Sequence, residues 1–134
     1  MTATIAERVA AGAQFLDEQD PDWWRADVDQ AIDLDRLDMG EGDACVLGQR
    51  CPLETLTAWL GGPPRDNYDY EYLFHAYAEK LTGLPSGGLN REALDAWAVA
   101  HGFNRASGTV DGGAAEYDAL TAEWARVIRE RRSA

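Results

Sequence analysis

The residues of this chain best suited to chemistry are two cysteines and two histidines, Cys45, Cys51, His75 and His101. Thiolate and imidazole groups are common zinc ligands, so a metal site is one interpretation of the set. The spacing argues against it, because Cys51 follows Cys45 by six positions and the set matches neither a zinc finger nor a thioredoxin-like motif. We therefore expect Cys45 to be a small buried residue, Cys51 a partly exposed thiol at a helix start, and both histidines to be structural.

Other signatures of catalysis or cofactor binding are missing from the sequence. No serine or cysteine lies in a nucleophile motif of the G-x-S-x-G type. Gly61-Gly62 and Gly87-Gly88 are typical of turns between helices and do not form a phosphate-binding loop. The sequence indicates no cofactor and favours a protein that is not an enzyme. A small enzyme or metalloprotein using the two cysteines and two histidines remains an alternative.

The acidic residues are concentrated in one part of the chain. The net charge is −12, and residues 17–43 contain eleven acidic residues against only Arg25 and Arg36, so this segment carries nine of the twelve net negative charges. Such a chain repels nucleic acid and anionic membrane surfaces, and attracts basic proteins. We expect no direct binding to nucleic acid or membrane.

The acidic segment has three interpretations. It could be a solvated surface that only keeps the protein soluble. It could be a docking face for a basic protein, and one form of this is a nucleic-acid mimic whose carboxylates replace phosphates. It could bind calcium, although it lacks the ligand spacing of an EF-hand. The candidate binding residues in it are Asp27, Asp29, Asp33, Asp35 and Asp38.

Two tyrosines are a second candidate for binding. Tyr68 and Tyr72 are four positions apart on a predicted helix and have acidic neighbours, whereas Tyr70 and Tyr77 share the apolar stripe of that helix. Tyrosine is enriched at protein interfaces, so an exposed pair would suit a binding patch. The alternative is that Tyr68 and Tyr72 only cover the edge of the core.

The elements that position these residues are predicted to be helices. The length of 134 residues and the apolar content of 46% suit one domain, residues 1–134, and we predict an all-α bundle of about five helices with an irregular acidic segment at 21–42. We expect residues 31–42 to be extended and to pack on the helices, and Ser107–Gly113 to be a loop. The predicted helices run from a Thr2 cap to Asp20, over Asp22–Gln30 (short), from near Asp43 to Gly61 with a break at Cys51-Pro52, over Asn67–Thr82, from an Asn90 cap to Gly102, and over Gly113–Arg132.

Gly48 and Gln49 lie near the start of the predicted helix that follows the acidic segment. A glycine here would let another backbone approach closely, because it has no Cβ atom. The amide of Gln49 could then form hydrogen bonds to that neighbouring chain. We interpret the pair as a packing feature that needs no chemistry.

Several short phrases resemble one group of proteins when they are taken together. They are Phe15-Leu16-Asp17, Trp23-Trp24, Ile32-Asp33-Leu34-Asp35-Arg36-Leu37-Asp38, Asp43-Ala44-Cys45-Val46-Leu47-Gly48-Gln49, His101-Gly102-Phe103, and Tyr117 with Leu120-Thr121 and Trp124. The set resembles short uncharacterised proteins of actinobacteria and their bacteriophages. The resemblance implies an intracellular protein and brings no known activity. The chain also has no apolar run of membrane-spanning length, so we expect a cytoplasmic protein with reduced cysteines.

The leading hypothesis is a non-enzymatic interaction protein, encoded by a phage in one version, that binds a basic host or phage protein through its acidic face. A structural or assembly component of a phage particle is the second hypothesis. The enzyme or metalloprotein described above is the third.

Overall fold

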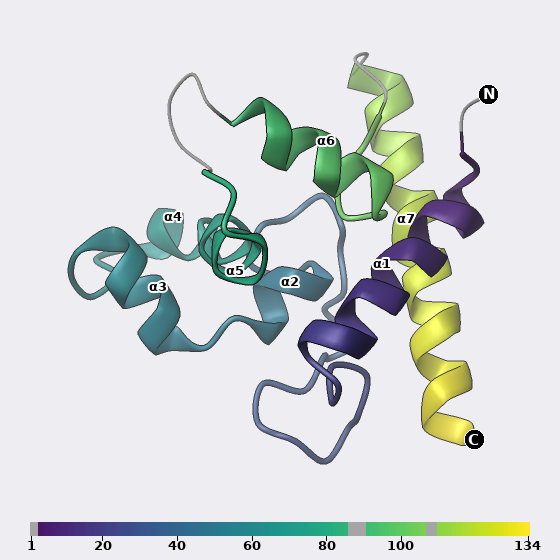
Figure 1. The fold of residues 1–134 in the computed structure, drawn as a ribbon, viewed down its shortest axis with the longest axis horizontal. Helices are drawn as coiled ribbons and strands as arrows, with labels where there is room; N and C mark the ends of the chain where they lie inside the picture. The colour runs from purple at the N-terminus through teal and green to yellow at the C-terminus, as the bar shows by residue number, and fades with distance from the viewer. Residues whose placement is uncertain (1–2, 86–90, 107–109) are drawn as a thin grey trace.

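The protein is all-α, as the sequence predicts. The computed structural model describes residues 3–85, 91–106 and 110–134, and its regular secondary structure over these ranges consists of helices (Figure 1). No described helix is long and apolar enough to cross a membrane. The helices are α1 (Ile5–Gln19), α2 (Val46–Arg50), α3 (Leu53–Leu60), α4 (Asn67–Tyr70), α5 (Leu73–Thr82), α6 (Glu92–Ala100) and α7 (Val110–Ser133).

The helices form two groups that share one core. α1 packs against α6 and α7, while α5 packs against α2, α3 and α6. The chain between α1 and α2 has no helix, and we call it the acidic loop (residues 20–45). Figure 1 shows it leaving the end of α1 in a wide loop before it returns to α2. The acidic loop therefore joins the two groups of helices.

Trp124 lies at the centre of the first group. Its ring stacks on Phe103 with 5.2 Å between centroids and meets the edge of Trp23 at 5.5 Å, and its Nε1 donates a hydrogen bond to the Gly102 carbonyl at 2.7 Å. α1 approaches this group closely at Gly12, where a Cβ atom would lie only 2.0 Å from the His101 carbonyl oxygen. The buried aromatic rings therefore hold α1, α6 and α7 together.

The helix starts differ in detail from the predictions. α1 begins with a capping box formed by Thr4 and Glu7 and not at Thr2, which lies outside the described residues. α2 begins at Val46 and not near Asp43, because the Sγ of Cys45 accepts the hydrogen bond of the Gly48 amide as its N-cap. Gly48 does allow a close backbone approach, since a Cβ there would lie 2.1 Å from the Gly42 carbonyl oxygen.

The predicted break and stop in the next helix are confirmed. α2 ends at Arg50 and α3 begins after Pro52, which serves as its N-cap. α3 ends at Gly61, whose φ of +79° is the left-handed conformation that favours glycine. α6 likewise ends just before Gly102, which has a φ of +72°.

The prediction of one continuous helix over Asn67–Thr82 is wrong, because a turn separates α4 from α5. In a continuous helix the Phe74 amide would donate to the carbonyl of residue 70, but it donates to the Gly42 carbonyl of the acidic loop at 3.1 Å. Tyr70 is consequently 38% exposed and does not belong to the core, whereas Tyr77 is buried as predicted.

Two further predictions concern the second half of the chain. α7 begins at Val110, so the predicted loop over Ser107–Gly113 is wrong from residue 110 onward, and residues 107–109 lie outside the described part. The predicted Asn90 cap and Gly87-Gly88 turn also lie outside it.

Candidate functional site

The acidic loop contains turns and no helix, so the predicted short helix over Asp22–Gln30 is wrong. A helix would pair its own carbonyl oxygens with amides four residues further along. Here the carbonyls of Trp24, Asp29 and Gln30 accept hydrogen bonds from arginine side chains of α2 and α7. The backbone of the loop is therefore satisfied by side chains from neighbouring helices.

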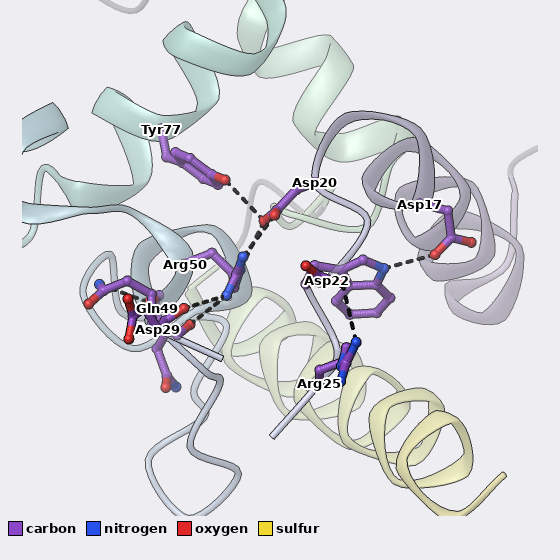
Figure 2. Close-up of polar contacts among 10 residues, drawn as sticks. Asp17, Asp20, Asp22, Arg25, Asp29, Gln49, Arg50 and Tyr77 are labelled. Atoms are coloured by element: carbon purple, nitrogen blue, oxygen red, sulfur yellow. Dashed lines mark hydrogen bonds and ion pairs between the residues drawn. The ribbon is translucent and has the colours of Figure 1, made fainter. Parts of the chain in front are cut away.

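Among these arginines, Arg50 donates the most hydrogen bonds to the loop (Figure 2). Its Nε and Nη2 donate to both oxygens of Asp20 at 2.8 and 2.7 Å, and its Nη1 donates to the carbonyls of Asp29 and Gln30, each at 3.0 Å. The Tyr77 hydroxyl donates to the same Asp20 carboxylate at 3.0 Å. Burial and the nearby Asp20 raise the pKa of Tyr77, so its hydroxyl remains a donor. Arg50 is only 8% exposed, and these bonds connect α2, α5 and the end of α1 to the loop.

Arg132 and Gln49 hold the next part of the loop. Arg132 donates to the carbonyls of Trp24 and Ile32 at 2.8 and 2.7 Å. The Gln49 amide oxygen accepts from the Asp33 amide at 2.7 Å, and its nitrogen donates to the carbonyls of Asp33 and Ala44 at 3.2 and 2.8 Å. The predicted hydrogen bonding of Gln49 to a neighbouring chain segment is thus confirmed.

Gln30 has an unusual backbone conformation that these contacts hold in place. Its φ is +60°, in the left-handed region that residues other than glycine rarely adopt. Its carbonyl accepts from Arg50, and its side-chain nitrogen donates to the Cys51 carbonyl at 2.9 Å. The surrounding contacts therefore fix a conformation that the chain alone would disfavour.

The five predicted aspartates of the loop are all exposed to solvent. Asp27 pairs with the Arg25 guanidinium, at 3.0 and 2.8 Å. In the part of the chain that the structure describes, the other four form no ion pair. Asp33 and Asp38 each accept a backbone amide two residues further on, from Asp35 and Gly40, at 3.0 and 2.9 Å. We call Asp27, Asp29, Asp33, Asp35 and Asp38 the acidic face.

Other acids near the loop are neutralised by arginines that lie far away in the sequence. Asp17 forms two hydrogen bonds with Arg131 of α7, at 2.6 and 3.0 Å, and accepts the Nε1 of Trp23. The hydrogen bond from Arg131 is the main cause that lowers the pKa of Asp17. The charge count over residues 17–43 could not reveal this compensation, because Arg25 and Arg36 are the only basic residues in that segment and Arg131 lies far from it in the sequence.

The predicted tyrosine patch is partly exposed. Tyr68 is 67% exposed and meets the edge of Tyr72, with 5.9 Å between ring centroids. Tyr72 is half-buried and stacks on Trp59 at 5.2 Å. Among the described residues no hydrogen bond joins either tyrosine to the acidic face. The structure therefore provides one exposed tyrosine and one that packs on the helices.

The structure does not gather the cysteines and histidines into a site. Cys45 is buried as predicted, but the prediction for Cys51 is wrong: it is 1% exposed, in the turn between α2 and α3, which both pack against α5. Burial raises the pKa of Cys45 to about 12 and that of Cys51 to about 11, so both are neutral thiols and poor nucleophiles at pH 7. No group of three or more candidate metal ligands occurs among the described residues.

The two histidines differ in their surroundings. The Nδ1 of His101 lies 2.7 Å from the Trp97 carbonyl near the end of α6, a contact that fits the predicted structural role. His75 packs against Trp59, Tyr72 and Phe74, and its Nδ1 is buried with no hydrogen-bond partner in the described structure. Burial is the main cause that lowers the pKa of His75, so its ring is neutral at pH 7.

Sequence reasoning missed the arginines that organise the irregular chain. Besides Arg50 and Arg132, the buried Arg8 donates to the carbonyls of Val99 and Asn104, at 2.7 and 2.5 Å, and pairs with Glu116. A signal was available for Arg8, since it follows Ile5 by three positions and so lies on the inward stripe of α1. No such signal exists for Arg50 and Arg132, whose partners are distant in sequence.

Comparison with protein families, curated proteins and solved structures finds no match to this chain. The geometry itself describes a set of exposed carboxylates on a backbone that buried side chains hold in place. Such an arrangement can bind cations or cationic side chains. The buried thiols of Cys45 and Cys51 offer no nucleophile.

Proposed function

We propose that this protein is a non-enzymatic interaction protein that binds a basic protein through its acidic face. The observation that carries the proposal is the combination of exposure and anchoring: Asp29, Asp33, Asp35 and Asp38 are exposed without an ion pair among the described residues, on a loop held by Arg50, Arg132 and Gln49. A surface that only provides solubility needs no fixed backbone. A binding surface benefits from one, because less conformational entropy is lost on association.

The chemistry of the face defines the partner. Carboxylates with no cation of their own attract lysine and arginine side chains and speed the encounter with a basic surface. Salt screens such contacts over a Debye length of about 10 Å at 0.1 M, so binding should weaken as ionic strength rises. A nucleic-acid-binding protein, from a phage or its host, has the required basic groove, and the chain would then act as a nucleic-acid mimic.

The test compares two variants of equal charge. In the first, Asp29, Asp33, Asp35 and Asp38 are replaced by asparagine, which keeps the side-chain oxygens that accept the amides of the loop turns. In the control, four exposed acids elsewhere become amides: Glu54→Gln, Glu92→Gln, Asp118→Asn and Glu130→Gln. Both proteins gain four units of charge, so a difference between them does not come from net charge. The control also breaks the exposed pair of Glu130 with Arg126.

The partner is first captured from lysate, identified by mass spectrometry and purified, and its affinity for each protein is then measured by calorimetry. We expect a basic partner whose Kd rises at least about tenfold with the loop variant and less than about threefold with the control, since tenfold corresponds to about 1.4 kcal/mol. Equal weakening by both variants would reduce the effect to net charge and contradict the proposal. An acidic or neutral partner would contradict it as well.

A further inference from the structure

A small pocket lies at the end of the acidic loop, just after the last aspartate of the acidic face. Its volume is about 220 Å³, and it opens between the loop, α5, α7 and the chain after α6. Apolar and aromatic residues line it, and two exposed glutamates, Glu41 and Glu71, are also among its lining residues. The apolar lining includes Met39, Phe74, Phe103 and Tyr117. We call it the Glu41–Glu71 pocket.

Close backbone contacts bring the two glutamates to the same pocket. A Cβ atom on Gly42 would lie 2.0 Å from the Glu71 carbonyl oxygen, so the chain beside Glu41 touches the turn between α4 and α5. The Phe74 amide donates to the Gly42 carbonyl at 3.1 Å, and the Met39 amide donates to the Thr121 hydroxyl at 2.9 Å. The pocket is therefore built before any ligand arrives.

Among the described lining residues, Glu41 and Glu71 carry the formal charges, while Arg105 lies beside the pocket, with its guanidinium carbon 5.8 Å from the centroid of the Tyr117 ring. No lysine or arginine lines it, and in the described part of the chain neither Glu41 nor Glu71 forms an ion pair. The other titratable groups of the lining stay neutral at pH 7: burial lowers the pKa of His75 and raises those of Cys45 and Tyr117. The two carboxylates thus set the charge of the pocket.

We propose that the Glu41–Glu71 pocket receives an arginine side chain of the basic partner, an inference that rests on the proposed function and names the contact that anchors it. The volume lies below the roughly 300–1,000 Å³ of pockets for small-molecule ligands, so it suits a single side chain. A guanidinium is flat, stacks on aromatic rings and binds carboxylates through several donors. Phe74 supplies a ring, since Phe103 is packed against Trp97 and Trp124 and Arg105 already lies over the Tyr117 ring. Glu41 and Glu71 supply the carboxylates.

The pocket is tested with a peptide, so that the result does not depend on the natural partner. The probe is acetyl-Gly-Arg-Gly-amide, titrated into the ¹⁵N-labelled full chain. The control is the same peptide with citrulline, which has the shape of arginine and no charge. We expect saturable shifts of the amides of residues 40–42, 71, 74, 75, 103 and 104, and at least about tenfold weaker binding of the citrulline peptide, because charge-assisted hydrogen bonds are lost. Equal binding of both peptides would overturn the proposal.

Variants of the rim complete the test. Glu41 and Glu71 are exposed, so E41Q/E71Q should fold, which an otherwise unchanged amide spectrum would verify. We expect this variant to weaken the arginine peptide at least about fivefold. The equally charged E18Q/E54Q, whose exposed glutamates do not line the pocket, should weaken it less than about twofold. Shifts spread over the acidic face and insensitive to E41Q/E71Q would overturn the pocket.

The two proposals can fail separately. If the partner depends on the acidic face but the peptide does not bind the pocket, the proposed function stands and the pocket is refuted. If the peptide binds the pocket while the partner ignores the asparagine substitutions, the acidic face is refuted as the docking surface.

Discussion

The acidic loop and the group formed by α1, α6 and α7 are two different solutions to the same problem. Both must satisfy buried backbone groups. The helices pair their own amides and carbonyls, and Trp124 and Phe103 fill the space between them, with Trp23 of the loop packed against Trp124. The loop has no such ladder and depends on polar side chains that reach in from elsewhere, mainly Arg50 and Arg132.

This difference teaches where each region is vulnerable. Packing in the helical group is spread over many contacts, so one polar change on its surface matters little. In the loop a single guanidinium satisfies several groups at once, so its loss removes all of those contacts together. We therefore expect stability to depend on a few polar side chains in the loop. In the helical group it should depend on side-chain volume at a few closely packed positions.

Replacing Arg50 by methionine should have the largest effect on stability. The change leaves the Asp20 carboxylate and the carbonyls of Asp29 and Gln30 without their main partner. Removing one member of a buried ion pair typically costs about 3–5 kcal/mol, and we expect a loss of that size in the free energy of unfolding, measured with urea.

The matched control for Arg50 is Arg25→Met. Arg25 also binds an aspartate through two hydrogen bonds, but its side chain is 45% exposed, and among the described residues it donates to no carbonyl of another segment. We expect a loss below about 1 kcal/mol, as for other surface pairs. Losses of equal size in the two variants would show that Arg50 does not anchor the loop.

Gly12→Ala should produce the next largest effect, in the helical group. The new methyl would lie 2.0 Å from the His101 carbonyl oxygen and 2.8 Å from the ring of Trp124, so α1 must move away. Overpacking of this kind costs about 1–3 kcal/mol, which a shift in the thermal midpoint would measure. Gly62→Ala is the control, because nothing lies within 4 Å of its new methyl, and it should leave stability unchanged or slightly raised.

Arg132→Gln should destabilise the loop locally. It removes the donors to the carbonyls of Trp24 and Ile32. Leaving a buried acceptor without a partner costs about 1–3 kcal/mol of stability, and we expect a loss near the lower limit because Arg132 is only half-buried. Hydrogen exchange should accelerate at amides of residues 23–33 and stay nearly constant in α1 and α6. The neighbouring exposed Arg129→Gln serves as the control. Uniform acceleration across the protein would mean that the loop does not open separately.

The same comparison explains which features the sequence could predict. Helix existence, the break at Pro52 and the stop at Gly61 depend on local preferences, so they were predictable. The exposure of the aspartates followed from their charge. The path of residues 21–42 and the split between α4 and α5 depend on contacts such as Phe74 with Gly42 and Arg132 with Ile32. These join residues 32 and 100 positions apart, and no local pattern encodes them.

The smallest predicted effect is a pH dependence of stability that comes from His75 in α5. Burial lowers the pKa of His75 below its ordinary value of 6.5, so below that pH the unfolded chain binds a proton that the folded chain resists. Stability should therefore fall as pH drops from 6.5 toward the folded pKa, by at most about 1.4 kcal/mol per pH unit for one group. His75→Phe, which keeps an aromatic ring between Trp59 and Tyr72, should flatten the stability curve in this window.

Asp17, which joins α1 and the loop to α7, should respond at lower pH. Its pKa is lowered from 3.8, chiefly by Arg131, so the stability it contributes is fully present above pH 3.8 and is lost as pH falls through the lower folded value. Urea unfolding of wild type, His75→Phe and Arg131→Gln between pH 2.5 and 7 would compare the two windows. This range brackets the ordinary pKa values of aspartate and histidine, about 3.9 and 6.5. Arg131→Gln should flatten only the acidic window and His75→Phe only the upper one. A common change in both windows would show that the aromatic cluster around His75 and the contact that ties the loop to α7 do not titrate as separate parts of the molecule.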